Sequence, residues 1–371
     1  MSKRRLAPAV RGRSDPARGG LYGLHVADGT QVYVPIEGLN VPEPFPVGCV
    51  TFRSAADVVD HLDGDVPASV LGELREMVRA RSVTAFAEVP LDEVEQAVEL
   101  AARAVDVLRV YERHGHDFAL HAHFGVASQL RATRVPCVFV GPGLRGVSVV
   151  PDSNFTGTTI DHVAFANDEL FQWLAGSIGD RAPSEGQRRA LVGVEMLSEA
   201  IIAPPRPAAA ALVTALEAWL KPDRDGALTF TLARSVAFLA CGSHNNVQCG
   251  RGSDTCPYLA LDPTESGVPR KLKRLRQAGT EPPWRCAEWQ IAIDWYELRS
   301  DVVHGKRPEV DRREMARHVH RVYRRLALPI LRWLADHPED PIGDLDVAIA
   351  GLPTPPDWEA ILGPMPPNRG T

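Results

Sequence analysis

The hydrophobic pattern of this 371-residue chain changes character at Ser184. Before Ser184, apolar side chains occur in short runs rich in β-branched and aromatic residues, which favour strands. After it, they recur at the spacing of helices. Ser184 and Gln187 have the three-residue spacing of a capping box, which predicts the start of a helix. We therefore expect an α+β protein, with an N-terminal mixed α/β region followed by a C-terminal all-α helical bundle.

The first half of the chain predicts several strands and one long helix. Pro35 lies inside the first strand and cannot donate a hydrogen bond to a ladder, so that strand is expected at a sheet edge. Residues 91–113 have apolar side chains at helical spacing. The predicted strands are 31–36, 47–52, 82–89, 118–126, 137–140 and 147–150.

The second half predicts helices at 185–203, 207–220, 227–240, 267–278, 284–304 and 309–335. The domain organisation that follows is a basic arm, expected to be disordered, then two folded parts and a tail. No motif indicates a role for the first folded part. The boundaries are 1–20 for the arm, 21–183 for the mixed α/β domain, 184–336 for the helical domain with an insertion at 241–264, and 337–371 for the acidic, proline-rich tail.

Composition excludes several classes of protein. The sequence contains no run of 18 apolar residues, so no membrane span is expected. The basic start lacks an apolar stretch behind it, which argues against a secretory signal. Without a secretory signal, the six unevenly spread cysteines are not expected to form a disulfide framework. We expect a cytoplasmic protein.

The segment with the clearest chemistry is Tyr296–Gly305, in which Arg299 precedes His304 by five residues. An arginine can hold a phosphate in a bidentate grip, and a histidine can transfer a proton near neutral pH. Gly305 is the residue type that closes helices in a left-handed conformation, so His304 is expected at a helix end. This pair suits metal-free cleavage of an RNA phosphodiester, where a 2′-hydroxyl loses its proton and the phosphorane gains charge.

This segment resembles the Arg-x4-His motif of HEPN domains, and within them the Apea-like branch, which often has a tyrosine, Arg-Ser and His-Gly at this spacing. Residues 215–220 and 228–239 are similar to earlier helices of that family, and the resemblance covers about 184–336. It implies a homodimeric helical bundle. It also implies a metal-independent endoribonuclease of a defence or stress response, or, alternatively, a non-catalytic module that binds RNA, nucleotide or a protein partner.

Further candidates for substrate binding surround the motif. Ser300 and Asp301 directly follow Arg299 and could orient His304 or a ribose, although a carboxylate at position 301 would also repel phosphate. Arg234 interrupts an apolar helix, where it would contact a phosphate or extend its head to solvent. Residues 191–335 carry 21 lysines and arginines against 16 aspartates and glutamates, which agrees with an anionic ligand.

Two groups of cysteines and histidines are considered as metal sites, and only the first has ligands in a suitable arrangement. Within and beyond the insertion, four of five residues could hold a structural zinc ion in tetrahedral geometry: Cys249 and Cys256 with two of the other three. The alternative is buried free thiols. The five residues are Cys241, His244, Cys249, Cys256 and Cys286. A second group, His114, His116, His121 and His123, lacks suitably spaced carboxylates and is interpreted as a polar loop and strand edge.

Overall fold

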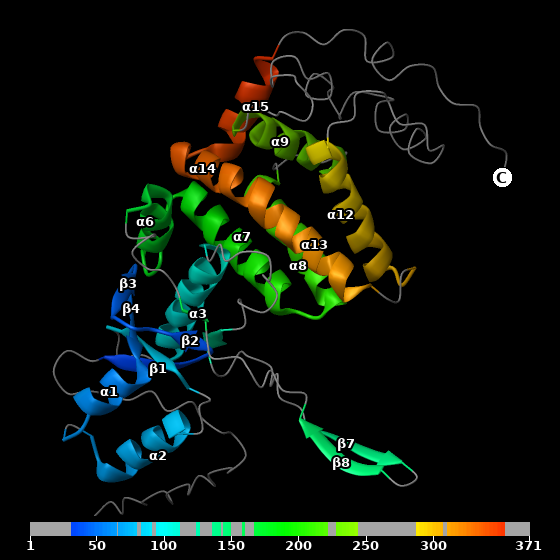
Figure 1. The fold of residues 1–371 in the computed structure, drawn as a ribbon. Helices are drawn as coiled ribbons and strands as arrows, with labels where there is room; N and C mark the ends of the chain where they lie inside the picture. The colour runs from blue at the N-terminus through cyan, green and yellow to red at the C-terminus, as the bar shows by residue number, and fades with distance from the viewer. Residues whose placement is uncertain are drawn as a thin grey trace, which may run out of the picture.

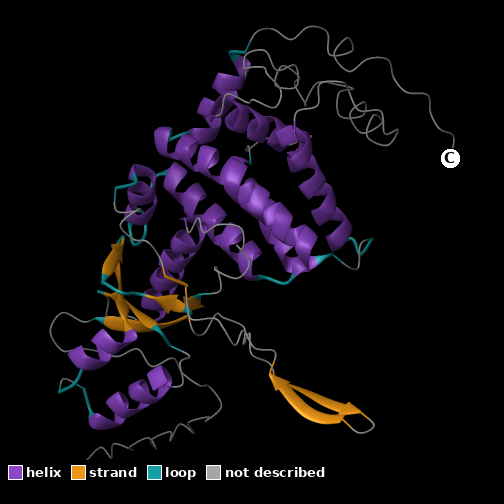
Figure 2. Ribbon diagram, viewed as in Figure 1, coloured by secondary structure: helices purple, strands orange, loops and turns teal. Residues whose placement is uncertain are grey.

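The structure is a computed structural model, and it describes twelve segments of the chain. These are residues 31–64, 66–79, 83–90, 94–111, 124–126, 136–141, 144–149, 158–159, 167–221, 228–243, 287–306 and 310–352. A small sheet with its helices forms the N-terminal part, and a helical bundle forms the C-terminal part (Figures 1 and 2). The predicted α+β class is confirmed at this level.

In the described residues, five strands form an antiparallel sheet in the order β3-β4-β5-β1-β6. Both faces of this sheet are covered: Val34 and Ala87 face one core, and Tyr33 and Phe86 face the other. Burial on both faces explains why β1 is apolar almost throughout its length. The strands are β3 (Phe45–Val47), β4 (Val50–Ser54), β5 (Ala85–Val89), β1 (Val32–Glu37) and β6 (Gly125–Val126).

The edge position predicted for the first strand is wrong, because β1 lies between β5 and β6. Pro35 is tolerated there because β6 is paired only with Ile36 and Glu37, while Pro35 is opposite Phe86 of β5. The apolar run 47–52, predicted as one strand, turns at Gly48 (φ 62°) and forms the β3–β4 hairpin.

Two pairs of short strands lie outside that sheet. β2 (Leu39–Asn40) is parallel to β9 (Thr158–Thr159), and β7 (Pro136–Gly141) forms an antiparallel hairpin with β8 (Leu144–Val149). The hairpin confirms two predicted strands. The predicted strand 118–126 is described only where β6 forms.

Helices cover the two faces of the sheet unequally. α1 (Ala55–His61) and α2 (Ala68–Arg79) cover one face, and neither was predicted. α3 (Val94–Tyr111), which confirms the predicted helix 91–113, lies on the other face. The bundle packs against the far side of α3, so α3 lies between the sheet and the bundle (Figure 1).

The helices of the bundle follow the predicted segments, except that no helix was predicted at 169–176 or at 341–350. Its described helices are α6 (Glu169–Gly176), α7 (Glu185–Ile202), α8 (Pro205–Leu220), α9 (Leu228–Ser243), α12 (Ala287–Val303), α13 (Arg312–Val322), a π-helical turn η2 (Tyr323–Ala327), α14 (Leu328–Asp336) and α15 (Pro341–Ala350). The predicted capping box is confirmed: the Gln187 amide donates to Ser184 Oγ at 3.2 Å, and the Ser184 amide donates to Gln187 Oε1 at 2.9 Å. The predicted helix 267–278 lies outside the described residues.

Two differences from prediction occur near the C-terminal end. The helix predicted at 309–335 contains the π turn η2 just before Pro329, whose ring nitrogen cannot donate the regular helical bond. α15 forms in what was predicted as a tail, and it buries Leu345 and Ile349. The rest of the predicted tail, 353–371, and the arm 1–20 lie outside the described residues.

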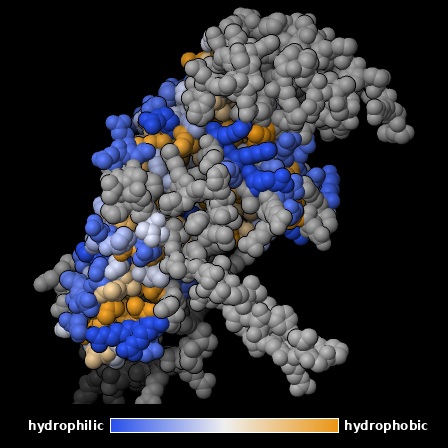
Figure 3. All heavy atoms as spheres, viewed as in Figure 1, coloured by the Kyte–Doolittle hydropathy of each residue, from blue (hydrophilic) through white to orange (hydrophobic). Residues whose placement is uncertain are grey.

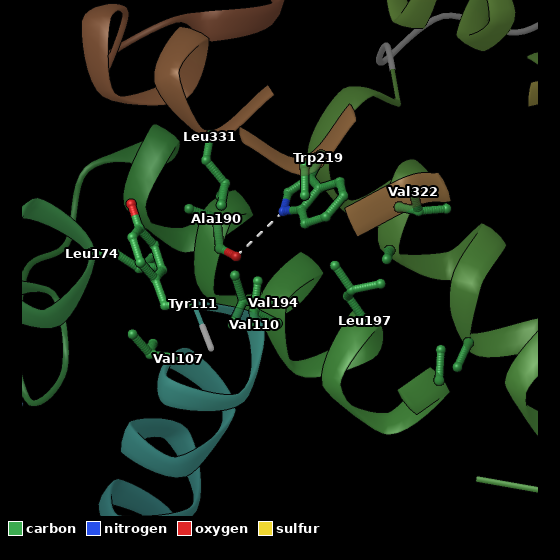
Figure 4. Close-up of a cluster of buried hydrophobic side chains, with 14 of the residues drawn as sticks. Val107, Val110, Tyr111, Leu174, Ala190, Val194, Leu197, Trp219, Val322 and Leu331 are labelled. Carbon is green, nitrogen blue, oxygen red and sulfur yellow. Dashed lines mark hydrogen bonds between the residues drawn. The ribbon is translucent and has the colours of Figure 1, made fainter. Parts of the chain in front are cut away.

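The core of the bundle is densest where α7 crosses α8. Trp219 is fully buried there, and its indole N–H donates to the carbonyl oxygen of Ala190 at 3.4 Å (Figure 4). A Cβ atom built on Gly193 would lie 2.0 Å from Trp219 Nε1. Glycine at position 193 therefore lets α7 and α8 approach each other closely.

A buried polar cluster joins α3 to α7. Arg109, 3% exposed, donates to Asp106 at 3.1 Å, to Ser198 Oγ and to the carbonyl oxygen of Phe124. Ser198 donates to Asp106 Oδ1 at 2.6 Å. The face of the sheet covered by α3 and the helical bundle share one continuous hydrophobic core, and this polar cluster lies within it.

Candidate functional site

The candidate site lies in the last two turns of α12. Glu297 and His304 are exposed, whereas Tyr296, Arg299, Ser300 and Asp301 are half-buried. α12 packs against α8 and α9, with Trp295, Leu298 and Val302 among its buried side chains. The helix therefore presents part of its C-terminal half to solvent.

Arg299 rests on an aromatic ring. Its guanidinium carbon lies 5.9 Å from the centre of the Tyr296 ring, one helical turn earlier. Tyr296 in turn donates its hydroxyl proton to Glu217 Oε1 of α8 at 3.0 Å. Burial, followed by the Glu217 carboxylate, raises the pKa of Tyr296, so the phenol stays protonated at neutral pH and keeps this bond.

The Arg299 guanidinium has no ion pair with any carboxylate among the described residues. Arginine carries five N–H donors, and the contact with the ring face leaves them uncommitted. Asp301 lies two residues further along the helix, where it does not share the face of Arg299. The site therefore holds a positioned cation that can bind an anion.

His304 follows the last residue of α12, as predicted from Gly305. Its backbone amide donates to the Ser300 carbonyl at 3.0 Å. Gly305 has φ 71°, and its amide donates to the Val302 carbonyl at 3.3 Å, which is the pattern of a glycine-terminated helix. The imidazole is exposed, so both ring nitrogens can reach a ligand in solvent.

Arg299 and His304 do not share one helical face. Five residues along a helix turn the side chain by about 140° and advance it about 7.5 Å. Arg299 consequently lies beside Tyr296, while His304 projects from the end of the helix. The side chains of Ser300 and Asp301 form no hydrogen bond with His304 among the described residues.

A histidine that sequence reasoning missed lies on the neighbouring helix. Trp295 Nε1 lies 2.9 Å from His318 Nδ1 of α13, and because an indole N–H only donates, Nδ1 must accept. Burial lowers the pKa of His318, and Glu314 Oε1 lies 3.7 Å from its Nε2. The four-residue spacing of Glu314 and His318 could have indicated their pairing, but nothing local indicates Trp295 as the donor.

The remaining predicted site residues lie on α9 or outside the described residues. α9 packs against α12. Arg234 is half-buried on α9 and already interacts within the chain. Cys241 belongs to the last turn of α9, but the side chains of all five predicted zinc ligands lie outside the described residues, as does the histidine group 114–123. Within the described segments, no three potential metal ligands gather. The zinc site stays a prediction.

Comparisons with known proteins give no match: no family model, no curated protein and no solved structure corresponds to this chain. None of the helices described above is long and apolar enough to cross a membrane. The functional conclusion therefore depends on the residues of the site itself.

Proposed function

We propose that the chain is a metal-independent endoribonuclease of the HEPN type, in which Arg299 and His304 act on an RNA phosphodiester. The observation that carries the proposal is the position of Arg299. Its guanidinium is held over Tyr296 without a carboxylate partner among the described residues. An arginine held in this way can bind a phosphate and stabilise the charge of the phosphorane.

The reaction needs one proton removed and one delivered. A neutral His304 imidazole takes the proton of the 2′-hydroxyl, and the 2′-oxygen attacks phosphorus as the bond to the 5′-oxygen breaks. A protonated imidazole gives its proton to the leaving 5′-oxygen. The products are a 2′,3′-cyclic phosphate and a 5′-hydroxyl, with no change in oxidation state.

One chain supplies a single His304, so base and acid at the same phosphodiester call for two copies. We propose a homodimer built on the helix 284–304, in which each copy contributes one Arg299 and one His304. The exposed end of α12 supports this arrangement. Val303, which directly precedes His304, is 57% exposed and could give the partner an apolar contact.

The alternative is a non-catalytic HEPN module that binds RNA, nucleotide or a protein partner. Asp301 favours it, since a half-buried carboxylate near the site opposes the approach of a phosphate. Binding without cleavage would support this second function.

A cleavage assay in EDTA tests the catalytic proposal. We expect the native chain to cut single-stranded RNA and leave 2′,3′-cyclic phosphates, and His304→Ala and Arg299→Ala to lose this activity. His61→Ala, which removes an exposed histidine of α1, is the matched control and should cut normally. Products with 5′-phosphates, or activity only with added magnesium, would sink the proposal. Full activity of a monomer in sedimentation would reject the dimer.

The predicted structural zinc is tested separately. If two of Cys241, His244 and Cys286 join Cys249 and Cys256 around one ion, the purified protein should carry about one zinc per chain. Metal content measured by emission spectroscopy checks this. Removing the zinc should lower the melting temperature, because the ion would stabilise the insertion. It should not abolish cleavage directly, because none of these residues is assigned to the chemistry. A preparation free of zinc and equally stable would reject the site.

A further inference from the structure

The segment that follows the candidate site is strongly basic. Between residues 312 and 332 the chain has seven arginines and one glutamate, a net charge of +6, although the whole chain carries −6. The rest of 191–335 has 14 basic and 15 acidic residues. The basic excess of the helical domain therefore comes entirely from α13, η2 and α14.

The four arginines of this segment whose side chains the structure describes are exposed. Met315, Val319, Val322 and Leu326 form the buried side of α13 and η2. Arg317, Arg321, Arg325 and Arg332 are all exposed, and we call these four residues the arginine line. The first three are four residues apart, so each step advances about 6 Å along the helix.

The outer face of α13 is turned to the viewer in Figure 1. Figure 3 shows deep blue, hydrophilic side chains on the part of the bundle where α13 lies. The arginine line spans 16 residues, and its 15 steps would advance about 22 Å in a regular helix. A line of this length can contact several consecutive phosphates of one strand.

The line begins next to the helix that carries the candidate site. The Trp295–His318 hydrogen bond fixes α13 beside α12, and His318 is flanked by Arg317 and, one turn later, Arg321. Trp295 is one turn before Arg299 on α12. From that contact the arginine line runs along α13 and α14 toward Asp336, away from the start of α13.

We propose that the arginine line binds the sugar-phosphate backbone of single-stranded RNA and guides the strand to Arg299 and His304. This inference rests on the proposed function, for which it names the surface that holds substrate outside the reacting phosphodiester. Recognition is independent of base sequence, because guanidinium groups on an exposed helix contact phosphate oxygens. Arg317 and Arg325 also interact within the chain, and the attraction comes from the summed charge of the segment.

The test measures binding apart from cleavage. The native chain and a triple variant, Arg317→Gln with Arg321→Gln and Arg325→Gln, are titrated against a fluorescent 2′-O-methyl RNA strand, which cannot be cut because its 2′-oxygen carries no proton. We expect the variant to bind on the order of tenfold more weakly at about 50 mM salt, and the slope of log K against log salt to become shallower by about 2.

Two controls isolate the line from general charge effects. A matched variant, Arg103→Gln with Arg181→Gln and Arg206→Gln, removes three exposed arginines elsewhere and should bind like the native chain. A variant with Arg317→Lys, Arg321→Lys and Arg325→Lys should show the native salt slope, since it keeps the three charges. Circular dichroism melting verifies that every variant is folded.

The outcomes separate this inference from the proposed function. An unchanged affinity and salt slope in the triple glutamine variant would overturn the arginine line, and so would an equal loss in the matched variant. A surface made for an acidic protein partner would give that same unchanged RNA affinity. Loss of binding in the triple variant alone supports the line, even if the native chain cuts no RNA and the cleavage proposal fails.

Discussion

The Tyr296 hydroxyl donates to a carboxylate oxygen of Glu217 at 3.0 Å, and this bond fixes the ring on which Arg299 rests. The two residues are 79 positions apart and belong to α12 and α8. Packing between helices thus determines where the guanidinium of the candidate site lies. Tyr296 and Glu217 are positioning residues, because the group they orient is the one assigned to the phosphate.

Two substitutions of Tyr296 should distinguish the contribution of its aromatic ring from that of its hydroxyl group. Tyr296→Phe keeps the ring but removes the hydroxyl donor, and it should lower the free energy of unfolding by about 1 kcal/mol. Glu217→Met, which removes the acceptor, should cost a similar amount. The two losses should not add in the double variant, which chemical denaturation can measure. Tyr296→Leu also removes the cation–π contact and should reduce kcat for RNA cleavage about tenfold with its pH profile unchanged. Native kcat in Tyr296→Leu would show that the ring does not position Arg299.

Gly305→Ala should loosen the end of α12. With nothing within 4 Å of a new Cβ atom, the whole penalty is the left-handed backbone at φ 71°. We expect a loss of about 1 kcal/mol in the free energy of unfolding and a lower cleavage rate, since His304 directly precedes the strained residue. Gly305→Asn, which tolerates this conformation, should recover most of both. Equal effects of alanine and asparagine would contradict this explanation.

Gly193→Ala should be the more damaging glycine substitution. Its Cβ atom would meet Trp219 Nε1 at 2.0 Å, and neither α7 nor the buried indole can move freely. A loss of about 2–3 kcal/mol in the free energy of unfolding is expected from denaturant titration. Gly72→Ala of α2 is the control: its Cβ atom meets nothing within 4 Å, and it should stabilise the chain by about 0.5–1 kcal/mol. A harmless Gly193→Ala would mean that α7 and α8 can separate.

The Asp106 carboxyl should make stability depend on pH. Burial raises its pKa from 3.8 to about 6, against the opposing effects of Arg109 and Ser198. Because the folded chain then binds this proton more tightly than the unfolded chain, the carboxyl contributes stability below pH 3.8 that is lost as pH rises through about 6.

Asp106→Asn removes this titration. The free energy of unfolding of the native chain, minus that of the variant, should therefore fall as pH rises from about 4 to 7, measured by urea titration at each pH. A difference that rises with pH would reverse the sign and refute the assignment.

Local signals in the sequence predicted local structure well. Ser184 with Gln187 marked the start of α7, and Gly305 marked the end of α12, because capping needs only neighbouring residues. α15 had a similar signal that was overlooked: Asp340 accepts from the Gly343 amide, and Pro341 begins the helix. Helix ends can therefore be predicted where the capping residues lie within a few positions of each other in the sequence.

Contacts between distant residues could not be predicted. Glu217 and Tyr296 are 79 residues apart, and Ser198 and Asp106 are 92 apart, so no spacing rule connects either pair. Pro35 was assigned to an edge by a rule about a single residue, whereas the position of β1 depends on which strands pair on both sides. For the site, the sequence indicated Arg299 and His304 but not the ring and carboxylate that position Arg299.

The position of α3 between the sheet and the bundle limits which fragments of this protein can fold alone. Its inner side packs on the sheet, and Asp106 and Arg109 reach Ser198 of α7. A fragment that begins at Ser184 would keep the arginine line and α12 but lose the surface that covers α7. The bundle is therefore not an independent folding unit. If it were fused to another protein without α3, its exposed apolar surface would promote aggregation.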